Sequence, residues 1–181
     1  MAQGVFPARS GWIALCPHRY SRGGVTEIAV DDLRQRGIRA VLLDLDNTLV
    51  GWQRSDLAEP VIRWIDELKS AGFRLYMVSN TRSGRRIQAL SERLGIPFTM
   101  RAWKPRAYGF QEALAAMGVE PTEAVMIGDQ MFTDVLGANR LGMYTVMVPP
   151  LARREFIGTK ISRMVEWALL CWFRATRRLE P

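Results

Sequence analysis

The chain has 181 residues, the length of one domain, and its 48% hydrophobic content excludes a wholly disordered or fibrous protein. Two cysteines and one histidine are too few for a disulfide scaffold or a multi-histidine metal site, and no apolar run reaches the length of a membrane span. The net charge is +7, and residues 152–181 hold seven basic residues against three acidic ones. This balance suits a solvated surface, nucleic acid, an anionic membrane or an acidic partner.

Short aliphatic runs alternate with segments of helical periodicity in the middle of the chain. We predict strands at 40–45, 73–78, 96–100, 124–127 and 145–148, separated by helices at 56–70, 84–94, 108–117 and 133–141. This alternation predicts an α/β fold with a three-layer, Rossmann-like open parallel sheet. Residues 1–36 then form a lead-in segment, 37–151 the core and 152–181 a basic tail. Folds of this class bind ligands at the carboxyl ends of their strands.

Polar side chains of a few types follow four of the predicted strands. In chain order they are Asp44, Asp46, Thr48, Ser79, Asn80, Lys104, Asp129 and Asp134. Carboxylate oxygens are the ligands that Mg²⁺ prefers, and clustered carboxylates repel one another unless a cation or a lysine compensates. The set therefore predicts a Mg²⁺-dependent phosphoryl-transfer site.

Each of these side chains has an expected role in such a reaction. Asp44 is the expected nucleophile, because a carboxylate can attack phosphorus and form an aspartyl-phosphate. Asp46 is expected to protonate the leaving group and then to activate water. Asp129 is expected to hold the metal, and Asp134 to ligate it, bind its waters or orient Lys104. We expect four further side chains to bind the substrate and stabilise its phosphoryl oxygens, namely Thr48, Ser79, Asn80 and Lys104.

These motifs resemble those of the haloacid dehalogenase-like (HAD) phosphatases. DLDNTL, which begins at Asp44, is similar to the nucleophile motif D-x-D-x-T/V, and GDQMFTD, which ends at Asp134, is similar to the acidic motif G-D-x(4)-D. Ser79 and Lys104 match the second and third motifs, and all four occur in the expected order. The resemblance implies that four aspartates ligate the metal, namely Asp44, Asp46, Asp129 and Asp134. It also implies that Asp46 binds Mg²⁺ through its backbone carbonyl.

More closely, the chain resembles the capless subfamily IIIA proteins of the YqeG type. LLDLDNTLV, LGIPF and GDQMFTDVLGANRLGMYT carry this resemblance, which spans residues 15–167 and departs from the pattern at Ser162, where asparagine is expected. Related members in yeast and plants are phosphatidylglycerophosphate phosphatases. The resemblance therefore implies a role in phospholipid biosynthesis.

The motif spacing predicts an uncovered site. Only 32 residues separate Asp46 from Ser79, and 24 separate Ser79 from Lys104. The predicted helices and strands fill both gaps, which leaves no room for a cap domain, although residues 50–55 can form a small flap. Capless members of the family act on bulky substrates, which include lipid headgroups, proteins and nucleic-acid ends.

The tail is predicted to form an amphipathic helix. Its apolar face carries Ile161, Met164, Val165, Ala168, Leu169 and Trp172, widened by Trp167, Leu170, Cys171 and Phe173, with Arg163, Arg174, Arg177 and Arg178 nearby. Such a helix packs on the core, forms a dimer or lies in a membrane interface. We expect a cytoplasmic protein whose tail packs on the core or contacts the inner face of the membrane.

The sequence thus predicts a Mg²⁺-dependent phosphomonoester hydrolase whose partner is a phosphorylated substrate, with phosphatidylglycerophosphate favoured. A phosphoprotein, a nucleotide or a nucleic-acid end is the alternative within this class, although the chain has no recognised nucleic-acid-binding motif, so we do not expect nucleic acid as a partner. A non-catalytic module that binds a partner protein or a membrane is the alternative outside it.

Overall fold

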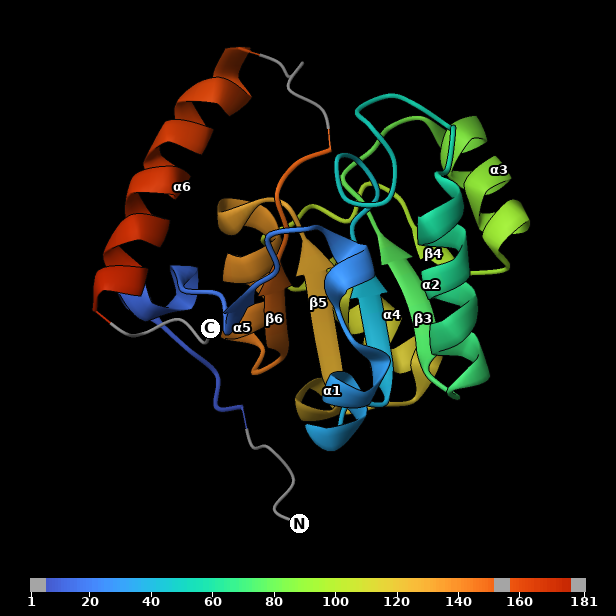
Figure 1. Ribbon diagram of the computed structural model, residues 1–181, viewed down its shortest axis with the longest axis horizontal. Coiled ribbons are helices and arrows are strands. Elements are labelled where there is room, and N and C mark those ends of the chain that lie inside the picture. The colour runs from blue at the N-terminus through green and yellow to red at the C-terminus, as the bar shows by residue number, and fades with distance from the viewer. Residues whose placement is uncertain (1–5, 152–156, 177–181) are drawn as a thin grey trace.

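The computed structural model describes residues 6–151 and 157–176 of the chain. Among these residues a six-stranded parallel sheet has the order β1-β6-β5-β2-β3-β4 (Figure 1). The strands are β1 (Arg19–Tyr20), β2 (Ala40–Leu43), β3 (Arg74–Val78), β4 (Phe98–Thr99), β5 (Ala124–Gly128) and β6 (Tyr144–Met147). From β2 the chain proceeds outward to β3 and β4, then returns to β5 on the other side of β2. The strand order therefore reverses between β2 and β5, where open α/β sheets bind their ligands.

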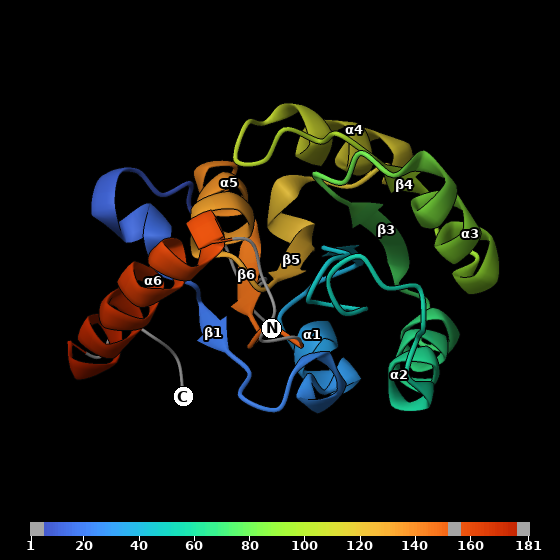
Figure 2. The ribbon, with the colours of Figure 1, turned by 90° about the horizontal axis from the view of Figure 1, so that it is seen from above.

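Helices cover both faces of the sheet, so the predicted three-layer α/β fold is confirmed. Seen from above, α1 and α2 lie on one side of the sheet and α4 and α5 on the other (Figure 2). The α-helices are α1 (Val30–Gln35), α2 (Glu59–Ser70), α3 (Gly84–Leu94), α4 (Tyr108–Met117), α5 (Leu136–Arg140) and α6 (Ile157–Ala175). Shorter helical turns are η1 (Gly11–Leu15), η2 (Val25–Glu27), η3 (Pro121–Glu123) and η4 (Met131–Val135), of which η4 is a π-turn.

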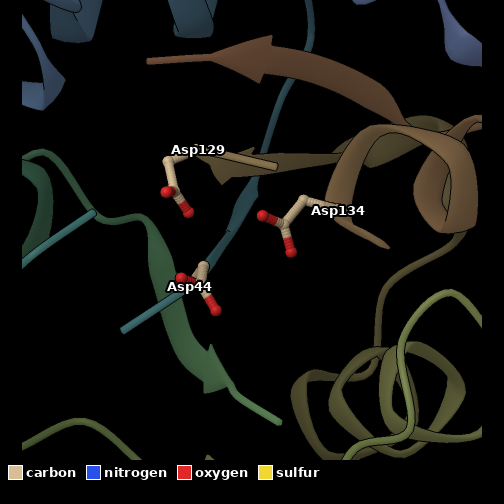
Figure 3. Close-up of side chains that lie close together, drawn as sticks. All are labelled: Asp44, Asp129 and Asp134. Carbon is tan, nitrogen blue, oxygen red and sulfur yellow. The ribbon is translucent and has the colours of Figure 1, made fainter. Parts of the chain in front are cut away.

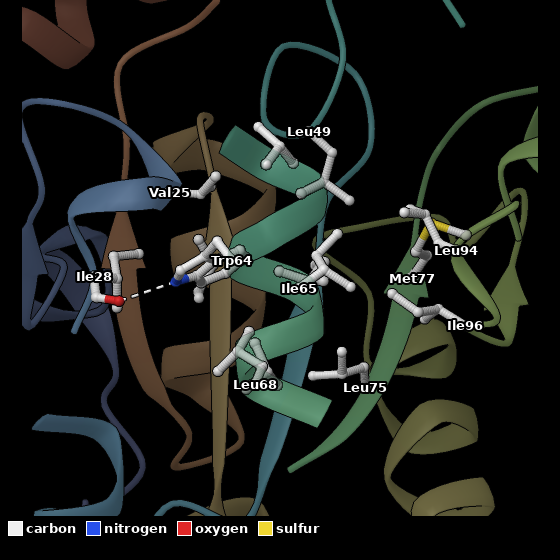
Figure 4. Close-up of a cluster of buried hydrophobic side chains, with 14 of the residues drawn as sticks. Val25, Ile28, Leu49, Trp64, Ile65, Leu68, Leu75, Met77, Leu94 and Ile96 are labelled. Atoms are coloured by element: carbon white, nitrogen blue, oxygen red, sulfur yellow. Dashed lines mark hydrogen bonds between the residues drawn. The ribbon is translucent and has the colours of Figure 1, made fainter. Parts of the chain in front are cut away.

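Alternating side chains of the strands enter two separate cores. On one face, Val41 and Leu43 of β2 pack with α1, α2 and α3, and on the other face Leu42 packs with α4 and α5. The apolar side chains of α2 recur every three or four residues, which gives the helix one buried face. Figure 4 shows Trp64 of this face, whose indole N–H donates to the Ile28 carbonyl oxygen at 2.9 Å. This bond anchors α2 to the segment that precedes α1.

Two predicted elements differ from the sequence expectation. The strand expected at 96–100 is limited to β4, which has two residues. The helix expected at 133–141 is divided into the π-turn η4 and the short helix α5. α5 lies close to α4 because position 137 is glycine: a Cβ there would be 2.5 Å from the Phe110 ring. The sequence analysis also missed β1 and α1, since two and six residues give too little periodicity to detect.

No cap domain interrupts the described residues between the motifs. The chain between Asp46 and Ser79 forms a loop, α2 and β3, and the chain between Ser79 and Lys104 forms α3 and β4. This confirms the capless architecture that the spacing predicted. The carboxyl end of the sheet therefore has no cap domain over it in the described part of the chain.

The tail forms the expected helix, α6, which lies beside the β1 edge of the sheet (Figures 1 and 2). Leu170 and Phe173 are buried against Cys16 and Met131. Several residues named for the predicted helix lie outside the described side chains, namely Ile161, Arg163, Met164, Arg177 and Arg178. α6 therefore packs on the core through a narrow face that lies at the margin of the apolar face predicted from sequence.

Candidate active site

A pocket of about 690 Å³ opens at the carboxyl ends of β2, β3 and β5. Five residues singled out from the sequence line it, namely Asp44, Asp46, Ser79, Asn80 and Lys104. Asp129 and Asp134 are buried beside it, in contact with Asp44 or Lys104. The structure thus brings residues from four separate segments of the sequence to the point where the strand order reverses.

Three carboxylates form a buried cluster at this point (Figure 3). Asp44 follows β2, Asp129 follows β5, and Asp134 belongs to the π-turn η4. One oxygen of each lies within 4.8 Å of the others. Ionised carboxylates this close repel one another strongly in a buried environment, so the arrangement requires positive charge.

Lys104 supplies one positive charge. Its Nζ lies 2.5 Å from Asp44 Oδ1 and 2.7 Å from Asp134 Oδ1. Burial by itself would lower the pKa of Lys104, but the carboxylates of Asp134 and Asp44 outweigh it and raise that pKa above its usual value. The lysine is therefore a permanent cation of the site.

Asn80 fixes the main chain on which Lys104 is carried. The Lys104 backbone N–H donates to Asn80 Oδ1 at 2.8 Å, and Asn80 Nδ2 donates to the Lys104 carbonyl oxygen at 3.1 Å. Asn80 was predicted to bind substrate, and it does line the pocket, but its amide is engaged on both sides with this loop. Its observed contacts are those of a residue that positions the lysine.

Ser79 and Thr48 are both almost completely buried. Ser79 Oγ accepts the Thr81 backbone N–H at 3.1 Å, and its hydroxyl can still donate toward the pocket that it lines. Thr48 Oγ1 lies 3.4 Å from Asp44 Oδ2 and 3.5 Å from Asp129 Oδ1. Thr48 therefore lies between two carboxylates rather than on the wall of the pocket.

The cluster fits a divalent cation. Among the described residues, three carboxylates face one ammonium group, an excess of two negative charges. Burial raises the pKa of Asp44 to about 6, against the opposing effect of Lys104. Asp134 Oδ1, although close to Lys104, has no hydrogen bond of good geometry in the described part of the chain. An oxygen-lined, anionic and partly unsatisfied site is what a hard divalent ion prefers.

The turn that carries Asp134 is tightly built. Asp134 Oδ2 accepts the Gln130 backbone N–H at 3.1 Å. A Cβ at position 128 would lie 2.3 Å from the same oxygen, so Gly128 is needed for the carboxylate to occupy this place. The Met131 backbone N–H donates to the buried carboxylate of Glu166, at 3.0 Å, on α6. The tail thus contributes a side chain to the support of this turn.

Asp46 lies apart from the carboxylate cluster. Its Oδ1 accepts the Gln53 backbone N–H at 3.1 Å, and its Oδ2 accepts Arg86 Nη2 at 2.6 Å. Arg86 also donates to Thr81 Oγ1 at 3.1 Å and to the Arg54 carbonyl oxygen at 3.0 Å. It therefore ties Asp46 to the flap at 50–55 and to the loop after β3.

Arg86 is the functional-site residue that the sequence reasoning missed. It lines the pocket from the first turn of α3, and its side chain is only 9% exposed. Arg86 lies 40 positions after Asp46, so no local sequence pattern indicates the pair. One sequence feature could have indicated Arg86: it lies in the first turn of the helix that follows the Ser79 motif. Such a turn lies at the carboxyl edge of a parallel sheet, where ligands bind.

Comparison with known proteins places this site in a family. Residues 19–142 match the haloacid dehalogenase-like hydrolases. The chain is 39% identical to a probable phosphatase, YqeG, of Bacillus subtilis. The 146 aligned residues cover 81% of this chain and 84% of that protein.

Two more distant similarities extend this result. A phosphatidylglycerophosphate phosphatase 1 of Arabidopsis thaliana is 29% identical over 152 residues, which cover 78% of this chain and 44% of that protein, so the chain spans less than half of that relative. A crystal structure of an uncharacterized protein from Listeria monocytogenes has a TM-score of 0.52 at 22% identity, over 74% of this chain and 98% of that one. At that identity it supports the fold alone.

Proposed function

Since the chain belongs to the haloacid dehalogenase-like hydrolases and is a phosphatase, we propose that it hydrolyses phosphatidylglycerophosphate with Mg²⁺ through an aspartyl-phosphate on Asp44. The observation that carries the chemistry is the buried contact of Lys104 with Asp44 and Asp134, beside Asp129 and next to an open pocket. A nucleophile, a fixed cation and a divalent-cation site then meet at one point. The alternative of a non-catalytic binding module is discarded, because the chain is a phosphatase.

In the first step, a carboxylate oxygen of Asp44 forms a bond to phosphorus while the bond from phosphorus to the substrate's alcohol oxygen breaks. The departing oxygen takes a proton from Asp46, which lines the same pocket. Before this step Asp46 has to release Arg86, take up a proton from water and turn to the leaving group. The side chain of Asp46 is 20% exposed, so this exchange takes place at the mouth of the site.

In the second step, water attacks the phosphorus of the aspartyl-phosphate and gives a proton to Asp46. The bond between phosphorus and the Asp44 oxygen breaks, inorganic phosphate leaves and both carboxyl groups return to their starting states. Lys104 stays beside the Asp44 carboxyl throughout, and Ser79 donates to a phosphoryl oxygen. The reaction is thereby divided into two displacements at one phosphorus atom.

Mg²⁺ would be held by Asp44, Asp129 and Asp134. When bound, it supplies positive charge that allows an anionic carboxylate to approach an anionic phosphate. The three side chains are buried and already close together, so little rearrangement is needed to surround an ion. Lys104 alone offers one charge, which does not balance the cluster.

Three observations support a lipid phosphate as the substrate. The site has no cap domain within the described residues, so a large substrate can reach it. Arg82 and Arg86 line the pocket together with Lys104, which suits a substrate with a second anionic group beside the phosphomonoester. Phosphatidylglycerophosphate carries such a second group, a phosphodiester. The relative from Arabidopsis is named for activity on this lipid.

The test is phosphate release from phosphatidylglycerophosphate in mixed micelles, with Mg²⁺ and with excess chelator. The wild type should release phosphate only with the metal, and Asp44→Asn should release none. Asp31→Asn, which removes an exposed carboxylate on α1, is the matched control and should behave as wild type. Hydrolysis of a small phosphoester without hydrolysis of the lipid would refute the substrate and move the search to phosphoproteins, nucleotides and nucleic-acid ends. Full activity of Asp44→Asn would refute the mechanism.

A further inference from the structure

The tail helix has a second apolar face that its packing leaves uncovered. Leu170 and Phe173 are buried against the core, whereas Val165 and Trp172 are 47% and 45% exposed. Ala168 is also exposed. Residues 165, 168 and 172 follow one another at helical spacing, so they share one side of α6. This side is the apolar face that the sequence predicted, and it is not the one that packs.

This face forms one wall of an apolar groove. The groove has a volume of about 570 Å³ and is lined by Trp12, Leu15, Phe132, Val165, Ala168 and Leu169. They come from three segments, η1, η4 and α6, so the groove exists only in the folded chain. Trp12 is 69% exposed at its rim. No helix in the described ranges is long and apolar enough to cross a bilayer.

The chemistry of the surroundings favours a lipid occupant. Tryptophan at an exposed position is the residue type that membrane–water interfaces favour, because its ring is apolar and its N–H is polar. The segment 152–181 carries seven basic residues against three acidic ones. The chain as a whole carries a net charge of +7. Apolar surface together with basic charge is complementary to an anionic bilayer.

The groove is joined to the active site through the π-turn. Phe132 lines the groove, while its neighbours in sequence Gln130 and Thr133 line the catalytic pocket. Asp134, in the same turn, belongs to the carboxylate cluster. The apolar groove thus lies on the other side of this turn from the catalytic pocket.

We propose that this groove docks the protein on the surface of an anionic lipid bilayer, with Trp12 and Val165 entering the interface. The choice of a lipid rests on the proposed function, whereas the docking itself is measured without catalysis. Binding through the groove would bring the open pocket to the membrane, where a lipid phosphate is presented. The protein would then act on lipid in the bilayer without extracting it.

Flotation of the full chain with vesicles tests this. The wild type should bind phosphatidylcholine vesicles that contain phosphatidylglycerol, and bind phosphatidylcholine vesicles weakly. The double variant Trp12→Ser/Val165→Ser should lose binding at least about tenfold, since two exposed apolar side chains leave the interface. Trp167→Ser is the matched control: Trp167 lies on the same helix and is 70% exposed, close to the 69% of Trp12, but it does not line the groove.

Activity on a small soluble phosphoester separates docking from catalysis, and it should be the same in all three proteins. Absence of vesicle binding by the wild type would overturn the proposal, whether or not the protein hydrolyses lipid in micelles. Equal loss in the control and the double variant would overturn it as well, because the groove would then be irrelevant. The proposal would also be overturned if the wild type sedimented as a dimer and the double variant as a monomer. The groove would then bind a second copy of the chain.

Discussion

His18, the one histidine of the chain, should make the protein less stable at acidic pH. The side chain is 6% exposed, and the Thr145 backbone N–H donates to its Nδ1 at 3.1 Å. Because Nδ1 accepts this bond, the ring is neutral in the folded protein. Burial, reinforced by Arg9 and Arg36, lowers the pKa of His18 to about 3.

The size of the effect follows from proton linkage. In the unfolded chain the histidine pKa is about 6.5, so at pH 5 the protonated form exceeds the neutral one about 30-fold. Folding has to release that proton, which costs about 2 kcal/mol at pH 5 relative to pH 8. The contribution to stability is complete above about pH 6.5 and is lost progressively as the pH falls toward 3. Any native pKa below about 4 gives nearly the same loss at pH 5.

The assay is equilibrium unfolding in urea at pH 8 and pH 5, for the wild type and His18→Asn. The asparagine Oδ1 can accept the Thr145 N–H as Nδ1 does, but the amide does not titrate. The substitution loses ring contacts with Phe6 and Tyr144 at both pH values, and this offset cancels in the comparison. The wild type should lose about 2 kcal/mol more than the variant between pH 8 and pH 5. Equal losses would refute the assignment of a neutral, buried His18.

Three further predictions concern the active site. Lys104→Met should lower kcat on a soluble phosphoester by at least about 100-fold, because the cation beside the phosphoryl group is lost; steady-state kinetics measures this. Gly128→Ala should weaken Mg²⁺ binding in isothermal titration, since the new methyl group would displace the Asp134 carboxylate, which lies 2.3 Å from the added carbon. Glu166→Leu should weaken Mg²⁺ binding about tenfold by removing the acceptor of the Met131 N–H, while Glu166→Gln should bind Mg²⁺ nearly as the wild type does.

Much of the sheet could be predicted because its central strands are buried on both faces. All four residues of β2 are buried and aliphatic, and β5 and β6 are equally buried, so each forms a run that is apolar apart from Thr145 and is visible in sequence. The carboxyl ends of such strands meet in space. This is why Asp44, Lys104 and Asp134 could be grouped before any coordinates were known.

What the sequence did not reveal depends on contacts between distant segments. Asp46 and Arg86 form an ion pair although they lie 40 positions apart in the chain. No sequence pattern in α3 or in the segment 50–55 indicates this contact. Asn80 was expected on the substrate and lines the pocket, and its amide also binds both polar groups of the Lys104 main chain, a contact that a sequence pattern does not encode. The π-turn also escaped detection, because a single turn of five residues is too short for its spacing to be told from that of an α-helix.

The segments outside the motifs hold the acidic turn in place from both sides. From the lead-in segment, the carbonyl oxygens of Ala14 and Cys16 accept the Asn139 amide, which anchors α5 at 2.9 and 2.8 Å. From the tail, Glu166 accepts the Met131 N–H at the start of η4. The turn between these two anchors carries Asp134. No cap domain lies between the motifs in the described ranges, and the lead-in segment and the tail support the turn that carries Asp134.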